Sequence, residues 1–211
     1  MQIVCLDLEG VLVPEIWIEF AERSGLPALR RTTREEPDYD TLMRYRLRIL
    51  AEQGLGLPDI QAVIAQMSPL PGAQAFLASL RERYQVIILS DTFYEFAHPL
   101  MRQLAWPTLF CHQLEVDSAG MLVDYRLRMP DQKRAAVERF RQLNFQVVAA
   151  GDSYNDVSML KAAHGGVFFR PSPSMALEFP EFPVTQDYVA LRQQLDAALA
   201  REVQSAAPHS D

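Results

Sequence analysis

Three short apolar runs, each followed at once by a polar cluster that contains an aspartate, constrain the fold of this chain most strongly. They cover residues 3–6, 86–89 and 147–150. Each run is continuously apolar rather than alternating in polarity, which is typical of strands buried on both faces of a parallel sheet. The clusters contain Asp7, Asp91 and Asp152. Because open α/β sheets bind ligands beyond the carboxyl ends of their strands, the three clusters predict a single site.

Helical patterns separate these runs, so the expected fold class is α/β, a Rossmann-like parallel sheet with helices on both faces. The stretch between the first two runs is unusually long for a single crossover helix. Its helical patterns cover residues 15–24, 39–53 and 57–67. We therefore expect a small helical cap, residues 14–70, inserted after the first strand of a catalytic core made of residues 1–13 and 71–211. A hairpin is predicted over residues 113–128, with Gly120 in its turn.

The composition limits the partners that this chain can have. Its formal net charge is −7, whereas nucleic acids and anionic membranes demand a basic face. No apolar stretch approaches the roughly 20 residues of a membrane span, and no secretory signal precedes the first strand. Cys5 and Cys111 are expected to be reduced thiols. We therefore expect a cytoplasmic protein that acts on small molecules, without a nucleic-acid or membrane partner.

The first polar cluster, Asp-x-Glu-Gly-Val, carries two carboxylates. A loop that leaves the sheet after a buried strand can place Asp7 and Glu9 on the same side of its turn. One carboxylate can attack phosphorus while the other handles the proton of the leaving group. The same short pattern also occurs in ordinary turns.

The second cluster and a lysine suit the binding of an anion. Ser90, Asp91 and Thr92 come directly before a helix predicted to begin near residue 93. A hydroxyl and N–H groups at a helix N-terminus form an anion cradle or an ordinary N-cap. Lys133 lies early in another predicted helix, a position where a lysine is usually solvated.

The third cluster suits a metal ion. It offers the carboxylates of Asp152 and Asp156 and the amide of Asn155 directly after a strand. Oxygen ligands of this kind serve hard divalent cations.

The order and spacing of these motifs resemble the haloacid-dehalogenase-like phosphohydrolases: Asp-x-Glu-Gly-Val after the first strand, Ser after the second, Lys on a helix, then Gly-Asp-x-x-x-Asp. The resemblance spans the chain from Asp7 to Asp156. It implies that Asp7 is the nucleophile and forms an aspartyl-phosphate, and that Glu9 is the general acid and base. It also implies Mg²⁺ as cofactor, held by Asp7, the backbone carbonyl of Glu9 and Asp152.

The same resemblance implies roles for the remaining polar residues. Ser90 and the N–H of Asp91 would hold oxygens of the transferred phosphoryl group, and Lys133 would neutralise charge between nucleophile and phosphate. Asn155 would touch the phosphate or a metal-bound water, and Asp156 would lie behind the metal ligands. Phosphoryl transfer depends mainly on positioning and on well-placed cations, which agrees with this division of roles.

The predicted cap resembles the substrate-binding helix of phosphoserine phosphatases, which implies phosphoserine as the substrate. There an acidic residue meets the substrate amine and an arginine clamps its carboxylate, because a guanidinium donates two parallel hydrogen bonds. The matching positions are Glu15, Met43 and Arg46. Arg44 and Arg48 alternate with Arg46 along the helix, and at most one of the three can face the site.

Two residues depart from the usual pattern. Glu9 stands where the family usually has Asp, and Asp91 stands where phosphoserine phosphatases usually have Gly. Both features resemble a variant group of phosphoserine phosphatases that also passes the phosphate to homoserine, so we expect water or homoserine as the acceptor. The Asp91 carboxylate should repel the phosphate unless it turns toward solvent, the metal shell or the substrate amine.

Three alternatives stay open on the sequence alone. One is a phosphatase of another small phosphomonoester. A second is a phospho-accepting receiver, although receivers place the phosphorylated aspartate mid-chain and lack a cap. The third is an inactive binding relative, made inactive by Glu9.

Overall fold

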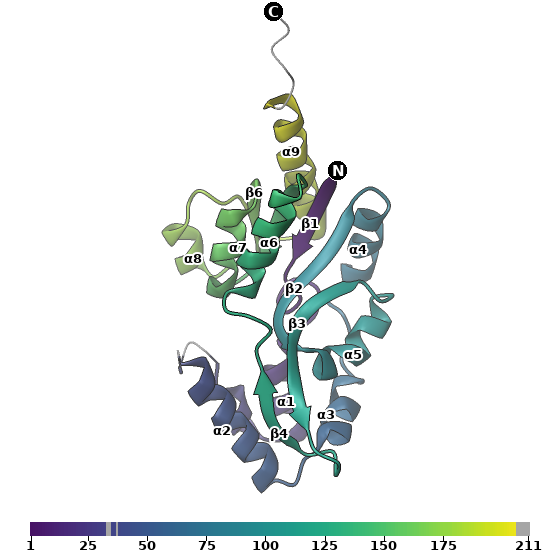
Figure 1. Ribbon diagram of the computed structural model, residues 1–211, viewed down its shortest axis with the longest axis vertical. Helices are drawn as coiled ribbons and strands as arrows, with labels where there is room; N and C mark the ends of the chain where they lie inside the picture. The colour runs from purple at the N-terminus through teal and green to yellow at the C-terminus, as the bar shows by residue number, and fades with distance from the viewer. Residues whose placement is uncertain (33–34, 37, 206–211) are drawn as a thin grey trace, which may run out of the picture.

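The computed structural model describes residues 1–32, 35–36 and 38–205 of the chain (Figure 1). Its centre is a seven-stranded sheet of order β4-β3-β2-β1-β5-β6-β7. Every neighbouring pair is parallel except β3 and β4. The strands are β1 (Gln2–Leu6), β2 (Gln85–Phe93), β3 (Thr108–Val116), β4 (Leu122–Arg126), β5 (Gln146–Gly151), β6 (Gly165–Phe169) and β7 (Val184–Thr185). The helices are α1 (Ile16–Ser24), α2 (Tyr39–Glu52), α3 (Leu57–Ile64), α4 (Ala73–Arg81), α5 (Tyr94–Gln103), α6 (Gln132–Gln142), α7 (Val157–Ala162), α8 (Pro173–Glu178) and α9 (Tyr188–Ser205), with 3-10 turns η1 (Pro27–Arg30) and η2 (Tyr154–Asp156).

The sheet is covered by helices on both faces, as the continuous apolar runs predict. Along β1, Val4 and Leu6 pack into a core with α4, α5 and α9, whereas Ile3 and Cys5 pack into a second core with α6 and α7. Successive side chains of a strand point to opposite faces, so a strand without polar side chains needs apolar cover on both. The predicted α/β fold class is therefore confirmed.

The cap helices α1, α2 and α3 lie beyond the carboxyl end of β1, beside the hairpin β3–β4 (Figure 1). The predicted hairpin reaches out of the sheet to contact them. The N–H of Leu57 donates to the carbonyl of Gly120 at 2.8 Å, and the Tyr125 hydroxyl donates to Asp40 at 2.6 Å. The hairpin thus joins the cap to the core, while the domain boundaries expected around residues 14–70 stay a prediction.

Strand β2 continues through residues 90–92, the polar cluster that the sequence places after it. Leu89 pairs with Phe110 and Phe93 pairs with His112, so β2 uses more residues than β3 over this stretch. A bulge of this kind redirects side chains, and residues 90–92 line a cavity at the sheet edge. The strand end expected at residue 89 is therefore wrong, because the bulged cluster still belongs to the strand.

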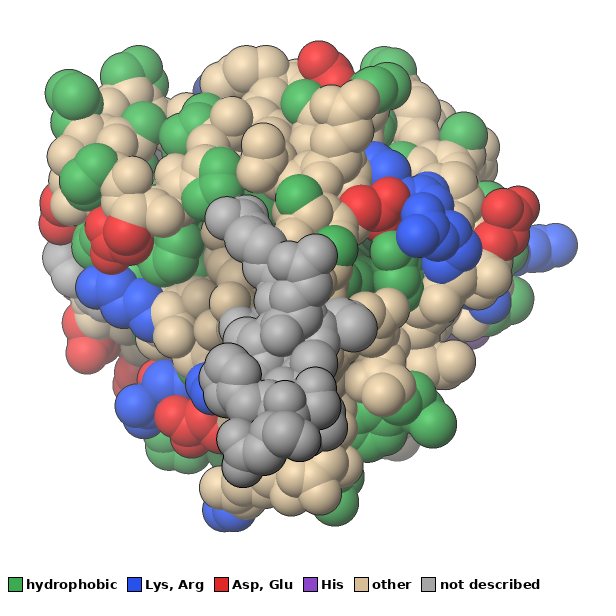
Figure 2. Space-filling model, turned by 90° about the horizontal axis from the view of Figure 1, so that it is seen from above, with side chains coloured by type: hydrophobic (Ala, Val, Ile, Leu, Met, Phe, Trp, Pro, Cys, Tyr) green, Lys and Arg blue, Asp and Glu red, His purple; other side chains and the backbone are tan. Residues whose placement is uncertain are grey.

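The surface seen along the long axis carries mixed charge. Figure 2 shows Lys and Arg side chains interspersed with Asp and Glu on the described part of that face, without a broad area of one sign. No helix in the described part of the chain combines the length and the apolar composition that a membrane span requires.

Candidate active site

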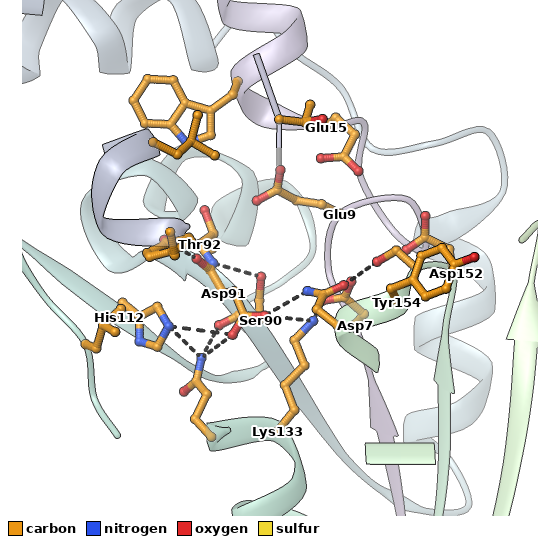
Figure 3. Close-up of a pocket in the computed structure, with 18 of the residues that line it drawn as sticks. Asp7, Glu9, Glu15, Ser90, Asp91, Thr92, His112, Lys133, Asp152 and Tyr154 are labelled. Atoms are coloured by element: carbon orange, nitrogen blue, oxygen red, sulfur yellow. Dashed lines mark hydrogen bonds and ion pairs between the residues drawn. The ribbon is translucent and has the colours of Figure 1, made fainter. Parts of the chain in front are cut away.

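The polar clusters from the three strand ends meet in one cavity of about 1120 Å³. Because β2, β1 and β5 are neighbours in the sheet, Asp91, Asp7 and Asp152 come to lie at the same edge. Lys133, near the start of α6, and Arg46, on the cap helix α2, line the same cavity. Figure 3 shows the core residues of this set pointing toward one another. The single site predicted from the sequence is therefore present in the fold.

Lys133 lies at the centre of the core side of the cavity. Its Nζ donates to Asp7 Oδ1 at 2.9 Å and to Asp156 Oδ1 at 2.7 Å, and Asp91 Oδ2 lies 3.5 Å away. Burial lowers the pKa of an ammonium group, but the Asp156, Asp7 and Asp91 carboxylates outweigh it and raise the pKa of Lys133. Lys133 is therefore a fixed positive charge beside Asp7.

Three carboxylates lie close enough to share a cation. Asp7, Asp152 and Asp156 each place an oxygen within 4.8 Å of the other two. Burial, with the charges of Asp156 and Glu15, raises the pKa of Asp152 to about 7. Burial and Asp156 likewise raise the pKa of Asp7, although Lys133 opposes them.

Asp152 also has an unmet contact. Its Oδ1 is buried, and no hydrogen-bond partner for it lies among the described residues. A hard divalent cation takes carboxylate oxygens as ligands, so it would relieve both the repulsion and the missing contact. The donor set therefore fits a divalent cation.

Asp156 is fully buried, and both of its oxygens are engaged by the protein. Oδ1 accepts from Lys133, while Oδ2 accepts the N–H groups of Asp152 and Ser153 at 3.0 and 3.1 Å. Gly151 is required for this arrangement, because a Cβ there would lie 2.3 Å from Asp156 Cγ. Asp156 thus shapes the loop after β5 from behind the cavity.

Gly10 allows the loop after β1 to approach the Asp152 carboxylate closely. Its φ of 76° lies in the left-handed region, and a Cβ there would meet the Asp152 carboxylate at 2.4 Å. Glycine alone adopts this conformation without a steric cost. The loop after β1 can therefore pass directly against Asp152.

Glu9 reaches from the loop after β1 toward the cap (Figure 3). Its Oε2 accepts the N–H of Ile16, the first residue of α1, at 2.8 Å. Burial and the nearby Glu15 carboxylate raise the pKa of Glu9 to about 8, against the opposing effects of the Ile16 hydrogen bond and of Arg46. A carboxyl group with this pKa is protonated at neutral pH and can act as a general acid.

Arg46 is the cap's buried cation. Its guanidinium lies 4.4 Å from the centre of the Trp17 ring, and NH2 donates to the carbonyl of Arg31 at 2.8 Å. Arg46 is 5% exposed, and its buried Nε has no hydrogen-bond partner among the described residues. Arg44 and Arg48 form surface ion pairs instead. Arg46 is thus the member of the three that lines the cavity.

Ser90 is 1% exposed and lines the cavity next to Asp91. The Asp91 carboxylate turns sideways, where it accepts from Asn155 at 2.7 Å and from Gln132 at 3.2 Å. Burial raises the pKa of Asp91, but Lys133 and these hydrogen bonds outweigh it and hold the pKa well below its ordinary value. Asp91 thus faces the core side chains of Asn155 and Gln132, while its role stays a prediction.

Most of the predicted site residues line the cavity, including Glu15 and Asn155. Met43 and Asp156 do not; Met43 is fully buried, and its sulfur accepts from Arg46 NH1 at 3.8 Å. The roles assigned to these residues stay predictions. The cavity is also lined by residues to which the sequence analysis gave no role, among them Trp17, Tyr39, His112 and Gln132. Gln132 carried the one available signal, since it directly precedes Lys133.

Comparison with known proteins gives consistent results. A model of the haloacid dehalogenase-like hydrolase family matches residues 1–164. The chain is 56% identical over 203 residues to phosphoserine phosphatase ThrH of Pseudomonas aeruginosa, a match that covers 96% of this chain and 99% of that protein. It is 54% identical over 203 residues to a phosphoserine phosphatase of Pseudomonas syringae pv. tomato, covering 96% of this chain and 86% of that one.

A solved structure, described as a phospho-aspartyl intermediate analogue of phosphoserine phosphatase, has the same fold. It superposes with a TM-score of 0.73 over 93% of this chain and 98% of that chain, at 20% sequence identity.

Replacing Asp152 by Asn should stabilise the metal-free protein and abolish its stabilisation by Mg²⁺. Because folding raises the pKa of Asp152 from 3.8 to about 7, the wild-type carboxylate destabilises the fold increasingly as pH rises through that interval. The gain in unfolding free energy of Asp152→Asn over the wild type should therefore be full above pH 7 and absent below pH 3.8. Urea unfolding across this pH range, with and without Mg²⁺, measures both effects.

In the wild type, Mg²⁺ at about 100 times its Kd should add about 2.7 kcal/mol to the free energy of unfolding. The control is Glu138→Gln, which removes an exposed carboxylate outside the cavity. An undiminished Mg²⁺ effect in Asp152→Asn would remove Asp152 from the proposed ligands.

Proposed function

The chain belongs to the haloacid dehalogenase-like hydrolase family, and we propose that it is a Mg²⁺-dependent phosphoserine phosphatase that acts through a phosphorylated Asp7. The observation that carries the choice of substrate is Arg46, a buried guanidinium without a carboxylate partner among the described residues, on the cap side of the cavity. The two Pseudomonas relatives bear the same activity in their names. The family and the arginine together support a phosphorylated amino acid.

In the first step Asp7 attacks phosphorus and the serine oxygen leaves. Glu9, whose pKa is raised to about 8, holds the proton that this oxygen takes. The Ser90 hydroxyl and the N–H of Asp91 hold the phosphoryl oxygens, and Lys133 offsets charge between them and Asp7.

The proposed metal ligands are the carboxylates of Asp7 and Asp152 and the backbone carbonyl of Glu9. Asp156 is proposed to orient this set, because its own oxygens are occupied by Lys133 and by two N–H groups. Mg²⁺ bound there supplies positive charge that offsets the charge on the transferred phosphoryl group.

Specificity is proposed to come from the cap. Arg46 would donate to the carboxylate of phosphoserine, and Glu15 would accept from its ammonium group. Met43, whose sulfur accepts from Arg46, would hold the guanidinium in place. Both cysteines are free, which supports the expected cytoplasmic location.

Homoserine phosphotransfer is proposed as a second activity of the same site. Homoserine carries the amino-acid head of serine plus one methylene, so Glu15 and Arg46 could hold it after serine departs. Glu9, in place of the usual Asp, extends to the cap at Ile16 and would take the proton of the incoming hydroxyl. An alcohol held beside the aspartyl-phosphate has a high effective concentration relative to water.

Asp7→Asn should keep the fold and reduce turnover of phosphoserine by roughly 10⁴-fold or more, because the amide cannot attack phosphorus. Acid quenching of the wild type during turnover of phosphoserine labelled in its phosphate group should leave labelled phosphate on Asp7. Label on a different residue would contradict the mechanism. Magnesium-dependent hydrolysis of an aryl phosphate that is lost in Asp7→Asn would also exclude a receiver and an inactive relative.

Arg46→Ala should raise KM for phosphoserine about 30-fold more than KM for an aryl phosphate, since cutting one partner of a buried charge pair costs roughly 2–5 kcal/mol. Arg44→Ala is the matched control, because Arg44 lies on the same helix in surface ion pairs. Steady-state kinetics on both substrates tests the difference. Equal losses on both would make Arg46 structural, and hydrolysis of other phosphomonoesters at least as fast as phosphoserine would favour the alternative substrate.

Adding homoserine to enzyme, Mg²⁺ and phosphoserine should yield phosphohomoserine at the expense of free phosphate. Glu9→Asp should shift the partition back toward hydrolysis, because the shorter side chain withdraws from the bound alcohol. Chromatographic separation of the products measures both. One free phosphate per serine at every homoserine concentration would leave the phosphatase and refute the transferase.

A further inference from the structure

The Asp91 carboxylate is a charge that the phosphate site must keep at a distance. About a third of its side chain, 34%, remains exposed beside the cavity, and its own N–H is proposed to hold a phosphoryl oxygen. Its side-chain partners come from three elements outside β2: Gln132 and Lys133 of α6, Asn155 of η2 and His112 of β3. Asp91 therefore lies where the ends of several elements converge.

His112 of β3, which is 4% exposed, lies next to Asp91. Its Nδ1 accepts the N–H of Arg128 at 3.1 Å, so a neutral ring carries its proton on Nε2. That Nε2 lies 3.6 Å from Asp91 Oδ1. The hydrogen bond from Arg128 thus fixes which nitrogen of His112 faces the carboxylate.

Gln132 reinforces the same side of Asp91. Its side-chain amide donates to Asp91 Oδ1 at 3.2 Å and also to the backbone carbonyl of Ser90. Gln132 is 2% exposed, and its Oε1 has no hydrogen-bond partner among the described residues. A buried amide with an unmet acceptor is costly, which favours a role beyond packing.

We propose that His112 and Gln132 are positioning residues that hold the Asp91 carboxylate against Asn155 and Lys133, and away from the phosphate bound beside Ser90. The proposal rests on the proposed phosphatase function. In this arrangement Oδ2 of Asp91 orients Asn155, while Gln132 and His112 hold Oδ1. The carboxylate can then serve the site without repelling the phosphate.

Loss of the restraint has a defined consequence. Freed from His112, the Asp91 side chain can rotate into the cavity, where its charge repels every phosphomonoester equally. KM should therefore rise for phosphoserine and for an aryl phosphate alike. This pattern differs from the one expected of Arg46, which concerns the amino-acid head of the substrate.

Two replacements of His112 separate its hydrogen bond with Arg128 from its contact with Asp91. His112→Asn keeps an acceptor near the position of Nδ1 and loses the donor that faces Asp91. His112→Gln keeps a donor near Nε2 and loses the acceptor for Arg128. We expect His112→Asn to raise both KM values about tenfold, the low end of what a donor facing a charged group contributes, and His112→Gln to keep KM close to the wild-type value.

His164→Asn is the matched control. His164 also accepts a backbone N–H through Nδ1, from Val147 at 3.0 Å, but it lies outside the cavity. Its replacement should leave both KM values unchanged.

The decisive measurement repeats His112→Asn in an Asp91→Asn background, where no charge needs restraint. The rise in KM caused by His112→Asn should disappear there. A rise of the same size in both backgrounds, or a larger effect of His112→Gln than of His112→Asn, would overturn the proposal. Should His112→Asn fail to fold, Gln132→Met removes the other donor and is compared in the same two backgrounds.

The test of the positioning role can fail or succeed independently of the proposed phosphoserine phosphatase function. If the wild type hydrolyses the aryl phosphate but not phosphoserine, the substrate assignment fails, while the KM values of the His112 and Asp91 variants for the aryl phosphate still test the positioning role. If phosphoserine is hydrolysed and the KM effects are absent, only the positioning role is lost.

Discussion

The buried ammonium group of Lys133 is the contact on which the catalytic edge of the sheet depends. Asp156 and Asp7 lie 2.7 and 2.9 Å from it, and Asp91 lies 3.5 Å away. The topology makes this crowding unavoidable, because β2, β1 and β5 are adjacent and each delivers a carboxylate. Burial and the charge of Asp156 still raise the pKa values of Asp7 and Asp152 despite Lys133, so one cation does not offset the whole cluster. The remaining deficit is what a divalent cation would fill.

The cap adds a buried cation to the same cavity. Arg46 is stacked on Trp17, and burial lowers its pKa to about 10 while leaving it charged at neutral pH. A buried guanidinium with an unmet Nε is costly until an anion arrives. The core side of the cavity is therefore rich in carboxylates and suited to a cation with its phosphate, and the cap side offers a guanidinium suited to a carboxylate, with Glu15 nearby. A small molecule with a phosphate at one end and an amino-acid head at the other satisfies both ends at once.

The parts of this arrangement that lie along one strand or helix could be predicted from the sequence, and the parts that depend on convergence could not. Asp7 and Asp152 were evident because each directly follows a buried strand. Helical periodicity left Arg44, Arg46 and Arg48 undecided; the family resemblance pointed to Arg46, and the structure buries Arg46 against Trp17 while Arg44 and Arg48 form surface ion pairs. His112 carried no local signal, since it lies within an ordinary strand and meets Asp91 only because β2 bulges against β3.

The cap also contacts Glu9, the proposed general acid. The first N–H of α1 donates to Glu9, and this hydrogen bond favours the ionised form of the carboxyl group. Burial beneath the cap and the charge of Glu15 act in the opposite direction and prevail, so that the pKa rises to about 8. The Tyr39 hydroxyl, at the start of α2, donates to the carbonyl of Asp91 at 3.4 Å. The cap thus contacts the core at Glu9 and at Asp91, the residues proposed as general acid and as part of the phosphate site, and its burial of Glu9 favours the protonated carboxyl group that a proposed general acid needs.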